Sequence, residues 1–325
     1  MEYTSLGKTG LQVSVAGLGC GGFSRLGQGT GSSVAESVAI VRQALDLGVN
    51  FIDTAADYRT EAIVGQALEE VRRDDVVLST KAAVAAGDNQ RSAADVVASL
   101  DQSLTDLRVD CIDVFHLHGV QTRDLHHACD TIVPALLRER DKGKFRFLGI
   151  TEYPTVDPTH ESLMQVLPRD LFEVIMVAYH MLHQSARRAI LPQTQDKGIG
   201  VLIMFAVRLL FSQPGRLQRI VGELVAAGRL PKALQNEADP LGFLLPREGG
   251  ARSVIDAAYR YCRHTSGTDV ILFGTGDANH VEANVESILS PPLPAAHVQK
   301  VESLFGMLTD VGLDIPAALT SPPAP

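Results

Sequence analysis

The sequence has no tryptophan and only four cysteines, at Cys20, Cys111, Cys129 and Cys262. The cysteines are far apart and form no CxxC pair, so they indicate a reduced, cytoplasmic protein and not a disulfide framework or a zinc site. No apolar run reaches membrane-spanning length, and the N-terminal residues lack the apolar core of a signal peptide. These absences favour a globular cytoplasmic protein.

Positive charge is also scarce, because 29 Lys and Arg residues face 38 Asp and Glu residues, for a net charge of −9. This balance argues against nucleic acid and against an anionic membrane as partners. There are ten histidines but no HExxH helix, so no metal is expected.

The usual nucleotide-binding and hydrolase motifs are absent or out of context. Gly17, Gly19 and Gly22 fit GxGxxG after a strand, but the next predicted helix begins only near Val34, too late to receive a pyrophosphate. This disfavours a Rossmann fold. The glycines fit a strand-to-loop turn, and a close approach of a ligand to the backbone would also explain them. No P-loop, no Tyr-x-x-x-Lys pair and no GxSxG elbow occurs.

What the sequence does contain is an alternation of short apolar strands with amphipathic helices. Strands are predicted at 15–19, 50–53, 76–80, 111–117, 145–150, 172–178, 200–204 and 270–273. Most are about 25–35 residues apart, the length of a βα unit. We therefore predict an α/β fold, a single (β/α)₈ barrel over residues 1–315. A hairpin precedes the first strand, a long loop (205–250) follows the seventh, and a mobile Pro/Ala-rich tail covers 316–325.

Capping signals place several of the helices. Ser33 and Glu36 form a predicted capping box for a helix over 34–47, which Gly48 ends. Asp157 is predicted to cap a helix that starts at Pro158. Another helix is predicted near 217–227 inside the long loop, and a last helix after Asp277.

Polar residues stand at the ends of three successive predicted strands. Asp53 and Tyr58 follow the second strand, Lys81 closes the third and His118 closes the fourth. The carboxyl ends of parallel strands converge in a barrel, so these side chains should share one pocket. The set suits proton transfer to a carbonyl oxygen. Tyr58 would be the acid or base, with its pKa lowered by Lys81, and Asp53 would hold that lysine charged. His118 would donate a hydrogen bond to the carbonyl.

Each of these residues alone has an ordinary structural interpretation, and only the combination indicates chemistry. His116 lies two residues before His118 and points the same way on a strand. A metal site would need a third ligand with matching spacing, and none is present. His116 is therefore predicted to be a buried histidine with satisfied hydrogen bonds, and His118 to be the catalytic one.

The motifs resemble the aldo-keto reductase superfamily over most of the chain. The pattern DTAxxYxxE matches at Asp53–Glu61, and the catalytic histidine follows Asp113 by five residues. Residues 143–151 resemble the fifth strand of that family, and Gly274-Thr275-Gly276 with Asn284 resembles its site for the cofactor phosphate and adenosine. The stretches DVFHLHG, GITE and FGTG are most similar to the galactose-dehydrogenase-like branch, which acts on sugars.

The resemblance implies a barrel that binds NAD(P)H and transfers a hydride between the nicotinamide and a carbonyl or alcohol. It implies a catalytic tetrad of Asp53, Tyr58, Lys81 and His118. The cofactor-binding residues expected on this basis are Gly21, Thr151, Glu152, Met176, Met204, Phe205, Gly274, Thr275, Gly276, His280 and Asn284.

The chain departs from the family pattern around the nicotinamide. Thr151-Glu152 replaces the usual Ser-Asn, Met176 replaces a Gln, and Met204 with Phe205 replaces a ring-stacking Tyr. Residues 274–284 contain neither Lys nor Arg. A 2′-phosphate without a fixed cation is poorly compensated, so NAD is favoured over NADP.

Other hypotheses remain open at this point. The altered nicotinamide contacts would also suit a cofactor-binding regulatory subunit with little turnover, and Asp53 with His118 would suit a barrel enzyme without redox chemistry. Arg208, Arg216 and Arg219 in the long loop either meet an acidic or polyhydroxylated substrate or lie on solvated helix faces.

Overall fold

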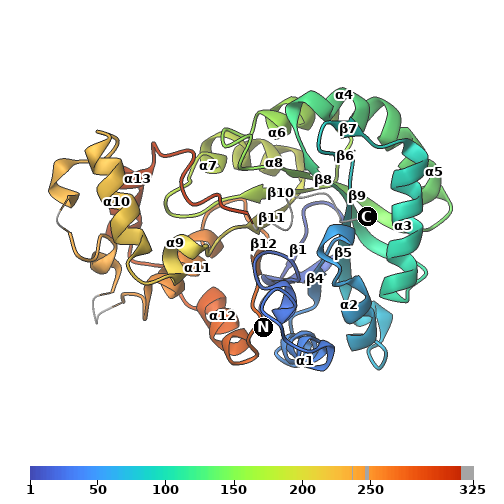
Figure 1. Ribbon diagram of the computed structural model, residues 1–325, viewed down its shortest axis with the longest axis horizontal. Coiled ribbons are helices and arrows are strands. Elements are labelled where there is room, and N and C mark those ends of the chain that lie inside the picture. Colours follow the sequence, from blue (N-terminus) through green and yellow to red (C-terminus); the bar gives the residue numbers. More distant parts are fainter. Residues whose placement is uncertain (236, 246–248, 316–325) are drawn as a thin grey trace.

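The computed structural model describes residues 1–235, 237–245 and 249–315. Within this range the chain forms a closed barrel of eight strands surrounded by helices (Figure 1). The predicted tail at 316–325 lies outside the described residues.

The barrel strands confirm the predicted (β/α)₈ architecture. They are β3 (Ala16–Gly19), β4 (Phe51–Asp53), β5 (Val77–Ala83), β8 (Ile112–Val120), β9 (Phe145–Glu152), β10 (Val174–Ala178), β11 (Gly200–Met204) and β12 (Val270–Phe273). They pair in chain order, all parallel, and β12 closes the barrel against β3. Every predicted strand is present, with ends that differ by a few residues.

A hairpin closes the amino end of the barrel. Its strands are β1 (Tyr3–Ser5) and β2 (Gln12–Ser14), as predicted. Its apolar residues Leu6, Leu11 and Val13 are buried in the same cluster as Phe51 and Val174 of the barrel interior. The hairpin therefore fills this end of the barrel with apolar side chains, which leaves the carboxyl ends of the strands for a site.

The surrounding helices follow the predicted alternation. They are α1 (Val34–Asp46), α2 (Glu61–Ala67), α3 (Ala93–Leu107), α4 (Leu125–His127), α5 (Val133–Asp141), α6 (Glu161–Val166), α7 (Ala186–Ala189), α8 (Leu191–Lys197), α11 (Val254–Arg263), α12 (Asn279–Leu289) and α13 (Ala295–Phe305). Ser33 and Glu36 form the predicted capping box of α1.

The start of α6 was predicted incorrectly. The helix begins at Glu161 and not at Pro158, because residues 153–160 form turns instead. The Asp157 carboxylate still caps the helix, since it accepts hydrogen bonds from the backbone N–H groups of Glu161 and Ser162 at 2.8 Å each. The capping chemistry was therefore recognised, but three residues too early.

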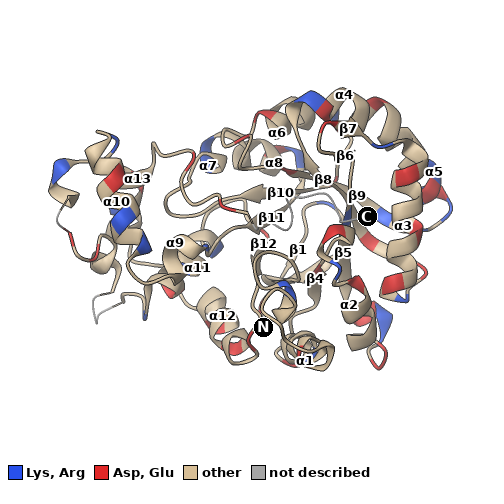
Figure 2. Ribbon diagram, in the orientation of Figure 1, with Lys and Arg blue, Asp and Glu red and all other residues tan. Residues whose placement is uncertain are grey.

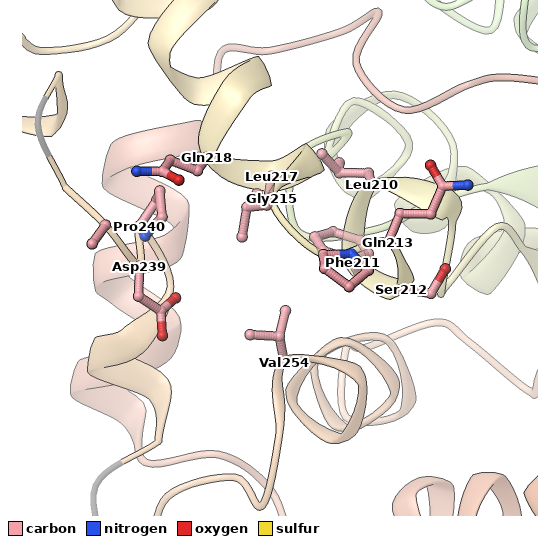
Figure 3. Close-up of a pocket in the computed structure, with 12 residues that line it drawn as sticks. Leu210, Phe211, Ser212, Gln213, Gly215, Leu217, Gln218, Asp239, Pro240 and Val254 are labelled. Atoms are coloured by element: carbon pink, nitrogen blue, oxygen red, sulfur yellow. The ribbon is translucent and has the colours of Figure 1, made fainter.

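The long loop after β11 carries the predicted helix and lies to one side of the barrel (Figure 1). It contains α9 (Leu209–Ser212) and α10 (Arg216–Ala226). A cavity of about 350 Å³ lies inside this lobe, with Phe211, Asp239 and Val254 in its wall (Figure 3). The residues of the predicted tetrad are not among those that line it.

The segment after α13 returns from this lobe across the carboxyl end of β10. Asp310 pairs with Arg229, and Asp314 pairs with Arg216 at 2.9 Å. Gly312 packs against the buried ring of His180. The segment therefore joins the lobe to the barrel through two ion pairs and one close contact.

Charged residues lie mostly on the outer helices and their connections, and few lie on the barrel strands (Figure 2). No helix in the described part of the chain is long and apolar enough to cross a membrane. Within the same residues, no three His, Cys, Asp or Glu side chains gather where they could hold a metal ion.

Candidate active site

The barrel interior changes from apolar to polar toward the carboxyl ends of the strands. Phe51, Val77 and Val114 belong to the apolar inner cluster. Because side chains alternate along a strand, residues at even spacing from them also face inward. Asp53 lies two residues after Phe51, and Lys81 lies four after Val77. This periodicity places the polar groups directly above the apolar layer.

Asp53 and Lys81 form a buried ion pair. The Lys81 Nζ atom donates to Oδ2 of Asp53 at 2.7 Å and to the carbonyl oxygen of Thr54 at 2.6 Å. Ser79 donates to the other oxygen of Asp53 at 2.7 Å. Burial alone would lower the pKa of Lys81, but the charge of Asp53, together with that of Tyr58 once the phenol ionises at high pH, outweighs burial and the net pKa of Lys81 is raised. Lys81 is therefore charged at neutral pH.

Tyr58 lies on a short 3₁₀ turn (Ala56–Tyr58) beside this pair. Its ring packs against Gly21, where a Cβ atom would collide with the ring. The Lys81 Nζ atom is 4.9 Å from the ring centroid. Gly21 therefore gives the phenol room to reach the lysine.

Lys81 lowers the pKa of Tyr58, as predicted, but the net pKa of Tyr58 is raised. Burial raises the pKa of Tyr58 and is the largest effect, and Lys81 only partly offsets it. Asp53 and Asp57 raise the pKa further. Tyr58 is accordingly a protonated phenol at neutral pH, which is the form that can supply a proton.

His118 lies next to Tyr58, as predicted. Its Nε2 atom is 3.4 Å from the Tyr58 hydroxyl oxygen, and the two rings meet edge to face at 87°. Its Nδ1 atom is 3.2 Å from Oδ2 of Asp57. The structure thus brings all four predicted tetrad residues together, and it adds Asp57 to them.

His116 is buried as predicted, but its hydrogen bonds are not satisfied. Neither ring nitrogen has a hydrogen-bond partner among the described residues. The ring lies against Gly149, where any side chain would collide with it. Burial lowers the pKa of His116 well below its usual value, and the charge of Lys81 lowers it further. The neutral ring of His116 therefore packs in the barrel interior below the tetrad.

The loop after β12 lies at the barrel mouth and is built on glycine. Gly274 is exposed beside the carbonyl oxygen of Gly19, and Gly276 packs on Gly27 so closely that a Cβ atom would approach its Cα to 2.9 Å. Thr275 is buried, and its hydroxyl accepts from the Asp277 N–H at 3.0 Å. The loop offers exposed backbone where a side chain would not fit.

The start of α12 is only partly free for an anion. The Asp277 carboxylate accepts from the backbone and side-chain nitrogens of Asn279, each at 2.9 Å. The side chain of His280 is 67% exposed, and Asn284 is half-buried one turn further. Arg252, from outside 274–284, pairs with Glu286 of the same helix at 2.8 Å.

Thr151 and Glu152 face opposite sides of the barrel wall. Glu152 shares its strand face with Leu148 and Ile150, which pack toward the helices. Its carboxylate accepts from the Ala178 N–H at 2.8 Å and is 2.6 Å from Nδ1 of His160. The Thr151 hydroxyl instead accepts from the Gly119 N–H at 2.7 Å. Both oxygens of Glu152 are thus engaged within the chain.

The two methionines occupy different layers of the interior. Met176 is buried in the apolar cluster and pairs in register with Leu202. Met204 is two residues after Leu202 and only partly buried, so it lies one layer nearer the mouth. Of the two, only Met204 is near the open end.

Arg208 is a buried cation that forms no ion pair among the described residues. The residue is 8% exposed, and its Nε and Nη2 atoms have no hydrogen-bond partner in the described structure. Its guanidinium carbon is 3.7 Å from the ring centroid of Phe205 and 5.4 Å from that of Phe23. Phe205 has a left-handed backbone (φ 71°), which is strained for a residue with a side chain.

Arg208 also spans the end of a strand. It follows β11 and Phe23 follows β3, and β12 lies between these two strands in the barrel. The guanidinium is therefore held across the carboxyl end of β12, where the loop Gly274–Gly276 begins. The other two arginines of the predicted set are paired, Arg216 with Asp314 and Arg219 with Glu223.

Asp57 was not identified from the sequence, and Arg208 was named only as one of three arginines. The signal for Asp57 was its position directly before Tyr58 in the motif. For Arg208 the signal was an arginine four residues after a barrel strand, within an apolar stretch. In both cases only the folded chain gives the direction of the side chain.

Comparison with known proteins agrees with this geometry. The model of the Aldo/keto reductase family matches residues 17–305. L-galactose dehydrogenase of Arabidopsis thaliana is 30% identical over 298 residues, covering 89% of this chain and 88% of that protein. Aldo-keto reductase YhdN of Bacillus subtilis is 30% identical over 217 residues, covering 62% and 61% respectively.

A solved structure has the same fold. The holo form of aldo-keto reductase AKR11C1 from Bacillus halodurans superimposes with a TM-score of 0.73 and 25% identity, covering 97% of this chain and 100% of that one. The chain therefore belongs to the aldo/keto reductase family and is an NAD(P)-dependent oxidoreductase that interconverts carbonyl compounds and alcohols.

Proposed function

We propose that Tyr58 is the general acid of carbonyl reduction and the general base of alcohol oxidation. The observation that carries this proposal is the protonated phenol beside the buried Asp53–Lys81 pair and 3.4 Å from His118. In reduction, the Tyr58 hydroxyl gives its proton to the carbonyl oxygen, and Lys81 stabilises the tyrosinate that remains. In oxidation, the same tyrosinate takes the proton of the alcohol.

The cofactor supplies the other half of the chemistry, since the bound nicotinamide provides or accepts the hydride. The residues at the mouth fit a dinucleotide. The guanidinium of Arg208, whose Nε and Nη2 atoms have no hydrogen-bond partner in the described part of the chain, and the exposed backbone at Gly274 are suited to its phosphates. Phe205 and Met204, after β11, and Gly21, after β3, would then contact the nicotinamide.

In this proposal Thr151, and not Glu152, contacts the nicotinamide. Glu152 faces outward, and both of its carboxylate oxygens are engaged within the chain. Met176 would support the site from the layer below and not touch the ring. Thr275 and Asn284 would contribute at the adenosine end, with His280 at the exposed edge.

We propose a preference for NADH over NADPH. Residues 274–284 carry no Lys or Arg, and Arg252 is already paired with Glu286. A 2′-phosphate at this end would therefore lack a free cation. Dissociation constants of NADH and NADPH, measured by the fluorescence of the reduced nicotinamide, test this directly. A tighter constant for NADPH would contradict it.

For the substrate, we propose an aldehyde, a ketone or the hemiacetal hydroxyl of a sugar. The similarity to L-galactose dehydrogenase over 89% of the chain supports the sugar class. Oxidation of a panel of aldoses with NAD, followed by absorbance of the NADH formed, tests it against reduction of simple aldehydes.

Tyr58→Phe tests the catalytic assignment. It removes the proton and keeps the ring against Gly21, so turnover should fall by about a thousandfold or more while NADH binding is unchanged. Unchanged turnover would exclude Tyr58 as the acid and base. Because the chain has no tryptophan, the nicotinamide fluorescence can be followed without an indole background.

A further inference from the structure

His118 is held by one oxygen on each side of its ring. Asp57 lies 3.2 Å from Nδ1, and the Tyr58 hydroxyl lies 3.4 Å from Nε2. The His118 side chain is 20% exposed and that of Asp57 is 50% exposed. The two oxygens belong to adjacent residues of one turn, so that turn sets both contacts of the ring.

The chemistry of the two oxygens differs. An ionised carboxylate has no proton and can only accept a hydrogen bond, whereas a phenol can donate or accept. The hydrogen bond from His118 holds the pKa of Asp57 below its usual value, although burial works in the opposite direction. Asp57 is therefore ionised at neutral pH, and the His118 nitrogen that faces it must carry a proton.

We propose that Asp57 is a positioning residue that fixes the proton of His118 on Nδ1. The proposal rests on the function proposed for Tyr58. A neutral His118 then presents the bare Nε2 lone pair to the reacting oxygen and accepts a hydrogen bond from Tyr58 or from an alcohol. Donation to a carbonyl oxygen, the role expected from the sequence, requires a second proton on the ring, with Asp57 as counter-ion. The neutral form with its proton on Nε2 is excluded.

This arrangement leaves the proton balance of the reaction unchanged. The hydride and the Tyr58 proton are still the two groups transferred. Asp57 determines whether the His118 nitrogen beside the transferred hydride and proton can accept or donate a hydrogen bond. Asp57, His118 and Tyr58 thus form a carboxylate–imidazole–phenol array, whose Tyr58 ring also contacts Lys81 of the Asp53–Lys81 pair.

Three substitutions of Asp57 separate its roles. Asp57→Leu removes the acceptor, Asp57→Asn keeps an acceptor oxygen without the charge, and Asp57→Glu keeps both on a longer side chain. The matched control is Asp130→Asn, since Asp130 is also half-exposed and also bonds a histidine, His126, but on the surface.

The first readout is the tautomer of His118, measured by long-range ¹H–¹⁵N NMR of the imidazoles and assigned through the signals lost in His118→Asn. We expect the Nδ1–H form in the wild type, in Asp57→Asn and in Asp57→Glu, and the Nε2–H form in Asp57→Leu. This readout does not depend on turnover. An unchanged tautomer in Asp57→Leu would overturn the proposal.

The second readout is kinetic. Asp57→Leu should lower kcat by roughly tenfold to a hundredfold with the NADH dissociation constant unchanged, and Asp57→Glu should recover most of the loss. Asp130→Asn should match the wild type. A full kcat in Asp57→Leu would also overturn the proposal. Failure of the proposed function would appear differently, as full turnover in Tyr58→Phe with the wild-type tautomer at His118.

Discussion

The Nζ atom of Lys81 lies 2.7 Å from Oδ2 of Asp53, and neither side chain is more than 4% exposed. Breaking such a pair by removing one partner leaves a buried charge without compensation. Asp53→Asn should therefore lower the free energy of unfolding by about 3–5 kcal/mol, measured by denaturant titration.

The control for Asp53→Asn is Glu223→Gln. Its partner Arg219 is also at 2.7 Å, but both side chains are about 60% exposed. Screened pairs of this kind contribute roughly 0.5 kcal/mol. Equal losses in the two variants would show that burial does not govern the strength of the Asp53–Lys81 pair.

Arg208→Leu should weaken dinucleotide binding and stabilise the fold at the same time. Burial lowers the pKa of Arg208 to about 10, which reflects the cost of holding this cation among Phe205 and Phe23. Removing it relieves that cost, whereas loss of a guanidinium–phosphate contact should raise the NADH dissociation constant about tenfold.

Both effects of Arg208→Leu are measurable on one sample, by nicotinamide fluorescence and by thermal unfolding. Arg219→Leu, in the same lobe but paired on the surface, should change the dissociation constant little. Undiminished NADH affinity in Arg208→Leu would mean that the cation serves a ligand other than the dinucleotide.

The raised pKa of Tyr58 predicts the alkaline limb of the reductase reaction. The acid must be protonated, so its contribution is present below the folded pKa and lost as pH rises through it. Because burial raises that pKa above its usual value, kcat/KM for carbonyl reduction should keep the contribution of this phenol throughout the pH range in which a free tyrosine is protonated. A limb that falls near pH 8 and persists in Asp57→Asn would contradict the dominance of burial at Tyr58.

Buried His183 predicts a loss of stability in acid. Burial lowers the pKa of His183 from 6.5 to about 3. Between these two pH values the imidazole is protonated in the unfolded chain but neutral in the folded chain. Stability falls across this window, and at pH 5 the loss is about 2 kcal/mol. His183→Gln should reduce the difference in unfolding free energy between pH 7 and pH 5 by that amount. His126→Gln, whose side chain is 89% exposed, should leave the difference nearly unchanged.

The strands and the proximity of Asp53, Tyr58, Lys81 and His118 were predictable because each depends on local pattern. A strand buried on both faces must be apolar, and polarity returns near its end, at Asp53 in the last position of β4 and at Lys81 two residues before the end of β5. The period of two along a strand then fixes which residues share the interior. His118 followed from the same rule, applied to the end of its strand.

The rest depended on quantities that no local pattern contains. The net direction of the Tyr58 pKa is a balance between burial and the Lys81 charge, and burial is known only from the folded chain. The side chain of Arg208 lies at the barrel mouth, whereas that of Glu152 faces the helices. Tertiary neighbours decide both directions. The start of α6 moved because residues after Asp157 found turn hydrogen bonds that competed with the helix.

The hairpin fills the amino end of the barrel, so the interior opens only at the carboxyl ends of the strands. Leu6 and Val13 allow no passage beneath the tetrad. Two molecules that both reach Tyr58 must use the same entrance, and the one that lies deeper must arrive first and depart last. The two molecules should therefore bind and leave in a fixed order.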